Sequence, residues 1–283
     1  MKSVARRLAG RSYAVSKRVA MSRMRGDGPP VVVFTMGKTG STAIARAVQD
    51  ATGHRVFQVF RLAGDRLAEA EARFRADARP PFPGALHLWE SEYLLRHLPT
   101  SAAPWTVITT VREPIAQAVS AFFHGGGRRG VLSGATTTDN LAETLLAERW
   151  VRAPLRWFDR EFAPALGVDV FAQAFDPELG YAEITTPSAR VLLLRQENLA
   201  IAPAVLGRFL GRAGPVPVPA RNEAAGKEYA GQYREFLASV RLPGPVLDQA
   251  YSSRYARHFY ADGELERFRQ RWAEGPAAAA SSG

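Results

Sequence analysis

The chain has 283 residues, of which 46% are hydrophobic and 23% charged, and it contains no cysteine. This composition is typical of a globular protein and excludes a mainly disordered, collagen-like or coiled-coil chain. The lack of cysteine also excludes disulfides, a cysteine nucleophile and thiolate metal sites. The net charge is +10, a value common among nucleic-acid-binding proteins, but its distribution favours another interpretation.

The positive charge is concentrated at the N-terminus. Eight of the 37 basic residues lie within residues 1–25, which contain no acidic residue, so 29 basic residues face 27 acidic ones in the rest of the chain. We therefore predict a basic arm over residues 1–28 and a nearly neutral body, and we do not expect nucleic acid as a partner.

Four apolar residues of the arm recur at four- and seven-residue spacing: Val4, Leu8, Val15 and Val19. This spacing predicts an amphipathic helix that can rest on an anionic membrane surface, with a solvated helix or a disordered tail as the alternatives. The chain has no continuous apolar run of the kind that a secretory signal or a membrane-spanning helix needs, so we expect a cytoplasmic protein that contacts the inner face of the membrane only peripherally.

After the arm, strands and helices alternate. Short apolar runs predict strands at 31–34, 55–60, 85–89, 105–111 and 189–194. Helices are predicted at 41–51, 65–78, 90–98, 114–123, 140–166 with a break near Pro154, 227–240, 245–256 and 262–273. A flexible loop is expected at 125–134 and a disordered tail at 276–283. The alternation predicts an α/β fold of three layers, a parallel sheet with helices on both faces, followed by a helical C-terminal half.

The segment after the first predicted strand has the composition of a phosphate-binding loop. Its candidate binding residues are Gly37, Lys38, Thr39, Gly40, Ser41 and Thr42. Glycines let the backbone approach an anion, the N–H groups at a helix start point toward it, and the lysine and hydroxyl side chains add donors. Lys38 is also one of only four lysines in the chain. The segment is not a Walker A motif, because residue 32 is valine where that motif requires its first glycine.

A second candidate anion site follows the strand predicted at 105–111. Arg112 comes directly after that strand, and Ser120 lies eight residues later on the following helix. Ligands of open α/β sheets bind outside the carboxyl ends of the strands, where Arg112 is predicted to lie. The two segments together predict a ligand with phosphate groups at two ends.

The segment 36–42 resembles the 5′-phosphosulfate loop of sulfotransferases, and residues 110–123 resemble their 3′-phosphate motif, including the arginine-to-serine spacing. Further segments at 157–162, 192–199 and 227–242 resemble bacterial capsular polysaccharide synthesis proteins. The resemblance covers roughly residues 30–245 and implies a single sulfotransferase-like, P-loop-like α/β domain over residues 29–275. It further implies an enzyme of polysaccharide biosynthesis that uses 3′-phosphoadenosine-5′-phosphosulfate (PAPS).

The resemblance also implies roles for individual residues. Lys38 would stabilise the charge on the leaving phosphate, and His87 or Glu90 would take the proton of the acceptor hydroxyl. Arg221 and Lys227 flank a late polar loop that would close over the 3′-phosphate, with a solvated helix start as the alternative. No carboxylate pair or histidine cluster stands at metal-ligand spacing, so no metal is expected.

The acceptor remains open between a glycan, a lipid-linked saccharide, a peptide tyrosine and a small natural product. Two other functions also remain open: a nucleotide-dependent kinase that uses the same loop, and a non-catalytic protein that binds nucleotide or nucleic acid.

Overall fold

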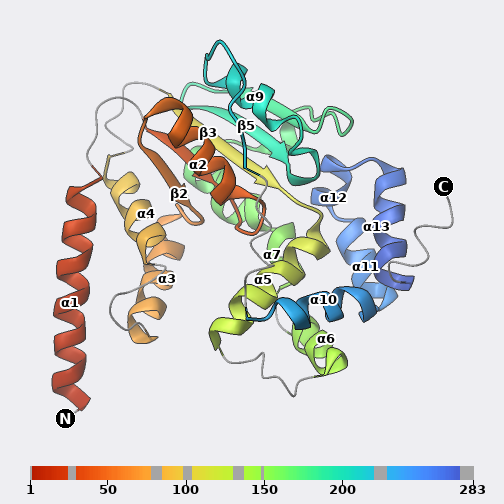
Figure 1. Cartoon of the computed structure of the whole chain (residues 1–283), viewed down its shortest axis with the longest axis horizontal. Helices are drawn as coiled ribbons and strands as arrows, with labels where there is room; N and C mark the ends of the chain where they lie inside the picture. Colours follow the sequence, from red (N-terminus) through yellow and green to blue (C-terminus); the bar gives the residue numbers. More distant parts are fainter. Residues whose placement is uncertain are drawn as a thin grey trace.

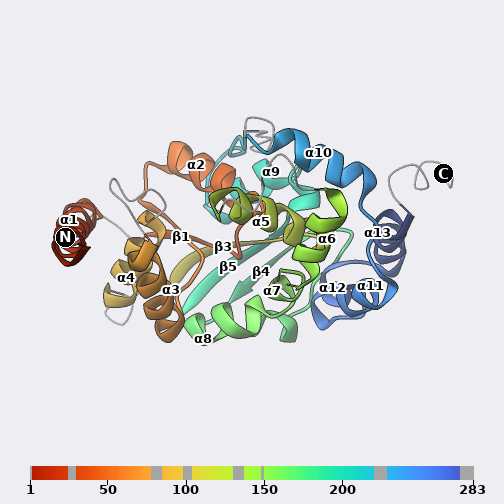
Figure 2. The same ribbon diagram turned by 90° about the horizontal axis from the view of Figure 1, so that it is seen from below.

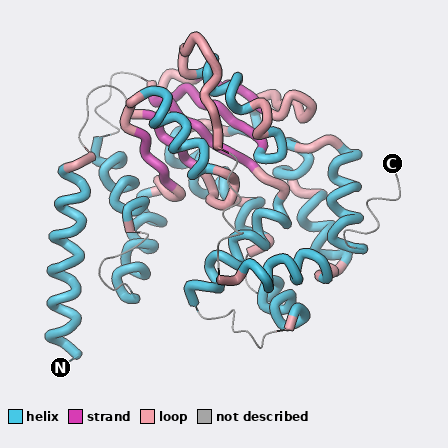
Figure 3. The backbone as a smooth tube through the Cα atoms, in the orientation of Figure 1, coloured by secondary structure: helices cyan, strands magenta, loops and turns pink. Residues whose placement is uncertain are grey.

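A five-stranded sheet forms the centre of the computed structural model, which describes residues 2–24, 30–77, 85–97, 104–129, 137–147, 150–219 and 228–274. The strands are β1 (Val31–Phe34), β2 (Val56–Val59), β3 (Trp105–Val111), β4 (Tyr181–Thr185) and β5 (Ala189–Arg195), in the order β2–β1–β3–β5–β4. Neighbouring strands are parallel except for β4, which pairs antiparallel with β5 at one edge. Figure 3 shows the strands in magenta with the cyan helices around them. The predicted α/β class with a mostly parallel sheet is confirmed.

Strand β1 shows why the sheet is covered on both faces. All four of its residues are buried. Successive side chains of a strand point to opposite faces. Val31 and Val33 accordingly belong to one hydrophobic core cluster, and Val32 and Phe34 belong to the other.

Helices α2 (Ser41–Thr52) and α9 (Ala202–Phe209) cover the first face, where Ile44, Val48 and Phe209 pack with β1. The other face is covered by α4 (Leu86–His97) and α5 (Pro114–Arg129), with Trp89 and Val119 in the larger core (Figure 2). Helices on both faces of the sheet confirm the predicted three layers.

The C-terminal half is mainly helical. It contains α6 (Thr138–Ala147), α7 (Arg152–Leu155), the π-helix η2 (Phe158–Phe162), α8 (Ala163–Leu166), the 3₁₀ turns η3 (Val170–Ala172) and η4 (Gln196–Asn198), α10 (Ala230–Ser239), α11 (Gly244–Tyr251), α12 (Arg254–Phe259) and α13 (Asp262–Glu274). Buried residues from these helices, including Phe162, Tyr255 and Trp272, join the core on the α5 face of the sheet.

Helix α1 (Lys2–Ser22) and helix α3 (Gly64–Asp77) lie beside α4, at the side of the molecule opposite α13 (Figure 1). The helix predicted for the basic arm is therefore present. It is docked against the body through Tyr13, whose ring packs against Trp89 with centroids 5.4 Å apart.

The strand predicted at 85–89 is wrong, because α4 begins at Leu86. The carbonyl of Ala85 accepts hydrogen bonds from the N–H groups of Leu88 and Trp89, which closes the first helical turn. Ala85, Leu88 and Trp89 are buried while Leu86 is exposed, a helical rather than alternating pattern. His87 and Glu90 thus lie on one helix, not at a strand end.

Other boundaries also differ from the prediction. Helix α5 continues through Gly125, Gly126 and Gly127 to Arg129, where the prediction ended the helix at residue 123. The helix predicted at 245–256 divides into α11 and α12, because the Ser253 side chain accepts the N–H of Ala256 and starts a new helix. The break near Pro154 is confirmed, whereas β4 and α9 were not predicted. The loop at 130–134 and the tail at 276–283 lie outside the described residues.

Candidate functional site

The loop between β1 and α2 has an unusual backbone. Gly37, Lys38 and Gly40 have φ angles of 83°, 59° and 84°. Among the residues that the structure describes, Lys38 is the only non-glycine with a positive φ. A side chain in this region costs free energy, and such residues concentrate at functional sites. Left-handed residues also turn successive N–H groups toward one concave surface, the arrangement that binds anions.

The loop is tied to the carboxyl end of β3 and to α5. The hydroxyl of Thr110 bonds to Thr39 Oγ1 at 2.6 Å, and Arg112 Nη1 donates to the carbonyl of Lys38 at 3.1 Å. The Gln117 amide on α5 donates to the carbonyl of Gly37 at 3.1 Å. The two predicted anion-binding segments are therefore joined by direct hydrogen bonds. Ser120 lies on α5 with a partly exposed side chain.

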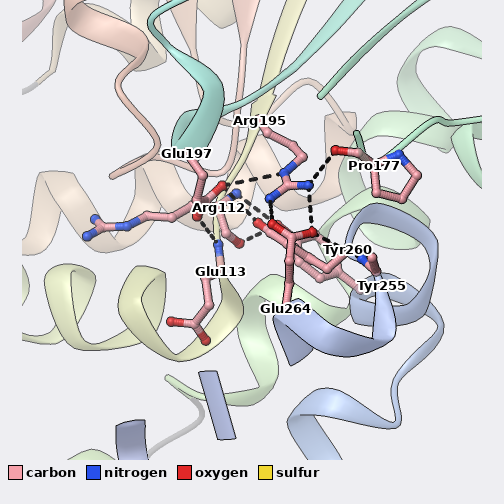
Figure 4. Close-up of polar contacts among 9 residues, drawn as sticks. Arg112, Glu113, Pro177, Arg195, Glu197, Tyr255, Tyr260 and Glu264 are labelled. Atoms are coloured by element: carbon pink, nitrogen blue, oxygen red, sulfur yellow. Dashed lines mark hydrogen bonds and ion pairs between the residues drawn. The ribbon is translucent and has the colours of Figure 1, made fainter. Parts of the chain in front are cut away.

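A cluster from the second half of the chain holds the main chain of the Arg112–Glu113 turn (Figure 4). The hydroxyl of Tyr255 accepts the N–H of Arg112 at 3.1 Å and lies 2.8 Å from the carbonyl of the same residue. Glu197 Oε1 accepts the N–H of Glu113 at 2.8 Å. The Arg112 side chain extends away from this cluster, so the cluster fixes the backbone from which the guanidinium reaches the loop.

Behind these residues lies the buried guanidinium of Arg195. It forms an ion pair with Glu264, donates to the carbonyl of Pro177 at 2.8 Å, and lies 4.4 Å from the ring centroid of Tyr260. The Tyr260 hydroxyl in turn donates to Glu197 Oε2 at 3.1 Å. These contacts connect Glu264, through Arg195, Tyr260 and Glu197, to the backbone N–H of Glu113. They orient the Glu197 carboxylate. The resemblance at residues 192–199 includes Arg195 and Glu197 but implies no role for either residue.

Glu113 is a buried carboxylate that anchors the start of α5. Its two oxygens accept the N–H groups of Ile115 and Ala116 at 2.7 Å each. They also accept the Tyr251 hydroxyl at 2.8 Å and the Trp272 indole N–H at 3.1 Å. Burial raises the pKa of this carboxyl above its usual range, and the four donors act against that rise. Glu113 therefore joins α5 to the two C-terminal helices α11 and α13.

On the other side of the loop, an open cavity of about 520 Å³ lies between α2, the edge strand β2 and α4. Its lining combines apolar, aromatic, polar and charged side chains: Thr42, Ala45, Arg46, Gln49, Asp50, Val56, Gln58, Phe60, Leu86, His87 and Glu90. His87 and Glu90 therefore meet in one cavity, as predicted for two residues that could reach one acceptor. Phe60 lies with its ring centroid 5.2 Å from that of His87.

Glu90 is connected to the loop through Gln58. Its Oε2 accepts the backbone N–H of Gln58 at 3.2 Å. The side-chain amide of Gln58 donates to Ser41 Oγ at 2.9 Å and to Thr42 Oγ1 at 3.1 Å. Burial raises the pKa of Glu90 to about 7, against the lowering effect of the Gln58 N–H and of Arg55. A carboxyl with this pKa exchanges a proton near neutral pH.

Arg221 and Lys227, the remaining predicted site residues, lie outside the described residues, so the structure assigns them no position. No group of three or more His, Asp or Glu side chains suited to a metal ion occurs within the described part of the chain. None of the described helices is long and apolar enough to cross a membrane.

Residues 135–261 match the family described as "Putative capsular polysaccharide synthesis protein". This range contains Arg195, Glu197, Tyr255 and Tyr260, four residues of the cluster behind Arg112. The β1–α2 loop, Arg112 and most residues that line the cavity lie before it. No curated protein and no solved structure matches the chain.

Proposed function

We propose that the chain is a sulfotransferase that moves a sulfuryl group from PAPS to an acceptor hydroxyl in capsular polysaccharide synthesis. The observation that carries this proposal is the position of the β1–α2 loop between two different sites. Because the strand order is β2–β1–β3, the loop has Arg112 on its β3 side and the cavity on its β2 side. A group held at the loop lies between a nucleotide bound on one side and an acceptor bound on the other.

The β3 side suits the nucleotide. Residues 37–42 would bind the 5′-phosphosulfate through backbone N–H groups, hydroxyls and Lys38, which makes the loop P-loop-like in function. Arg112 and Ser120 would bind the 3′-phosphate through charge-assisted hydrogen bonds. Arg221 and Lys227 would add positive charge over the same phosphate.

The transfer requires few chemical groups. The acceptor oxygen forms a bond to sulfur while the bond between sulfur and the phosphate oxygen breaks, and the nucleotide leaves as adenosine 3′,5′-bisphosphate. Lys38 stabilises the negative charge that grows on the leaving phosphate. His87 or Glu90 takes the acceptor proton, since both line the cavity beside the loop.

The cavity favours a saccharide among the acceptors that carry a hydroxyl. Arg46, Asp50 and Gln58 offer hydrogen-bonding groups, and the Phe60 ring offers an apolar surface beside them. Sugars combine hydroxyls with apolar ring faces, so this mixed lining fits them. The family match of residues 135–261 supports the same class of acceptor.

Ligand-induced thermal shifts test the nucleotide assignment. We expect adenosine 3′,5′-bisphosphate to stabilise the protein, by about 2.7 kcal/mol at a concentration 100 times its Kd. Adenosine 5′-monophosphate should stabilise it much less at the same concentration. Arg46→Ala is the control, because Arg46 lines the cavity and its loss should leave the nucleotide shift unchanged.

Stabilisation by ATP with Mg²⁺ but not by the bisphosphate would overturn the proposal in favour of a kinase. If the bisphosphate binds, transfer of labelled sulfate from PAPS to capsular oligosaccharides tests catalysis directly. A protein that binds the bisphosphate but transfers no sulfate to any hydroxyl acceptor would be a nucleotide-binding protein, not the enzyme proposed.

A further inference from the structure

The two faces of α1 are built differently, and the face against the body is polar and aromatic. The Trp89 indole N–H donates to the Tyr13 hydroxyl at 2.9 Å, and that hydroxyl lies 3.2 Å from Glu71 Oε1. Lys17 forms ion pairs with Glu71, at 2.6 Å, and with Glu92. Tyr13 is only 4% exposed. Side chains of α3 and α4 therefore hold α1 by one face.

The opposite face of α1 exposes valines. Val15 is 59% exposed, the highest value among the exposed large hydrophobic residues in the described part of the chain, and Val19 is 45% exposed. A surface helix normally turns its apolar stripe toward the core. Here that stripe, which the spacing of Val15 and Val19 marks in the sequence, faces away from the body.

Positive charge accompanies the exposed valines. Arg18 is exposed next to Val19. Residues 1–25 as a whole contain eight basic residues and no acidic one. The outward face of the described part of α1 thus combines two exposed valines with Arg18, in a segment without any negative charge.

We propose that this face of α1 docks in the plane of an anionic lipid bilayer. The valines enter the boundary between headgroups and acyl chains, and the basic residues contact the anionic headgroups. The apolar centre favours lipid over nucleic acid, because phosphate backbones are bound by basic and polar side chains and offer no partner for two exposed valines. Since α1 packs on α4, which carries His87 and Glu90, the docked protein holds its cavity close to the membrane surface.

Vesicle sedimentation of the full chain tests the proposal. The expected result is strong binding to vesicles with about 30% phosphatidylglycerol, little binding to pure phosphatidylcholine, and weakening as salt is raised. Arg18→Glu should lower the partition coefficient about tenfold, because each basic residue near an anionic surface contributes roughly a fivefold change and the reversal adds repulsion. The double variant Val15→Asp, Val19→Asp should lower it at least about tenfold.

Two control variants make the same chemical changes elsewhere. Leu179→Asp alters an equally exposed apolar residue, and Arg212→Glu alters an exposed arginine, both far from α1 in sequence. Both should bind vesicles like the wild type. All five altered residues are exposed, and an unchanged melting temperature of each variant establishes that differences in binding are not due to unfolding.

Three results would overturn the proposal: equal binding to neutral and anionic vesicles, wild-type binding by the valine double variant, or equal loss in the controls. Binding to a duplex oligonucleotide is measured as well. If the protein binds the duplex but not the vesicles, and the valine changes leave duplex binding intact, then α1 contacts nucleic acid. None of these outcomes depends on sulfate transfer, so the proposed enzyme activity stands or falls separately.

Discussion

The two sides of the β1–α2 loop are stabilised in different ways. On the β3 side, side chains from distant parts of the sequence hold main-chain groups in place. The Tyr255 hydroxyl, for example, holds the N–H and the carbonyl of Arg112. On the β2 side, the functional groups are side chains of α4 that line an open cavity. Under the proposed function, the first side recognises one fixed charge pattern, whereas the second leaves space for a variable acceptor. Substitutions on the two sides should therefore change different measurements.

The largest effect should come from Lys38, which lies on the loop between the two sides. We expect Lys38→Ala to lower turnover about 10²–10³-fold, because its ammonium meets charge that grows in the transition state. Binding of adenosine 3′,5′-bisphosphate should weaken far less. Steady-state kinetics at saturating PAPS, together with calorimetric binding, separate the two effects. Unchanged turnover would remove Lys38 from the catalytic groups.

The proton acceptor on the cavity side comes next. We expect His87→Ala to lower turnover about a hundredfold while PAPS binding remains intact, and Glu90→Gln to be mild. If Glu90→Gln lowers turnover strongly and His87→Ala is mild, then Glu90 is the group that accepts the proton. The pH profile does not discriminate, since burial raises the pKa of Glu90 to about 7, close to the reference pKa of about 6.5 for an imidazole. With either base, turnover rises with pH. If neither variant loses more than about tenfold, the base lies in another segment.

Glu90 should also change stability with pH, whatever its role in catalysis. Its pKa is raised from 4.5 to about 7 in the folded chain, so between these values the folded state binds more protons than the unfolded state. Stability therefore falls as pH rises through this window. Glu90→Gln should remove a destabilisation on the order of 3 kcal/mol above pH 7 and have little effect near pH 4. Urea unfolding of both proteins at the two pH values measures this difference in the free energy of unfolding. A difference that does not change with pH would contradict the burial of an ionised carboxylate.

On the β3 side, Arg112→Ala should change selectivity instead of turnover. Loss of a charge-assisted contact of about 1.5–3 kcal/mol should lower the preference for adenosine 3′,5′-bisphosphate over the 5′-monophosphate about 10- to 100-fold. The ratio of the two dissociation constants is the measurement. An unchanged ratio would place the 3′-phosphate elsewhere.

The smallest effect on recognition is expected for Tyr255→Phe. The variant leaves the N–H and the carbonyl of Arg112 without their buried partner, which should lower the selectivity ratio about fivefold and the free energy of unfolding by about 1–3 kcal/mol. Tyr251→Phe is the matched control, because its hydroxyl binds the Glu113 side chain. The control should lose similar stability but keep the ratio. An equal loss of selectivity in both variants would show a general loss of folding instead of positioning of Arg112.

Local patterns in the sequence predict much of the β3 side. The apolar run of β1, the glycines after it and Arg112 after β3 are each readable over a few residues, and strand order then brings the segments together. The predicted strand at 85–89 failed because a mostly apolar run of five residues fits a buried strand and the first turn of a helix equally well. The cavity side depends on packing between α4 and the edge strand, which no short segment encodes.

The cluster behind Arg112 was not predictable for a related reason. Arg195, Glu197 and Glu264 are charged residues of kinds that are usually exposed, and Arg195 is buried between its partners only when β5 and α13 meet. A resemblance at 192–199 marked the segment without indicating what its charges contact. Likewise, the spacing of Val15 and Val19 predicted the helix α1 and its apolar stripe, but not the contacts of Tyr13 and Lys17 that hold its other face against the body.

The hydrogen bonds to the Arg112–Glu113 turn also set an order of events during synthesis. The loop at residues 35–40 and β3 leave the ribosome early, but the partners of the turn lie as far along the chain as Tyr255 and Trp272. A nascent chain that ends before these residues has the β1–α2 loop without the groups that fix Arg112 and the start of α5. The turn is therefore fixed only after the segment from Tyr251 to Trp272 has been made, and a chain truncated before that segment lacks the groups that position Arg112 for the proposed nucleotide.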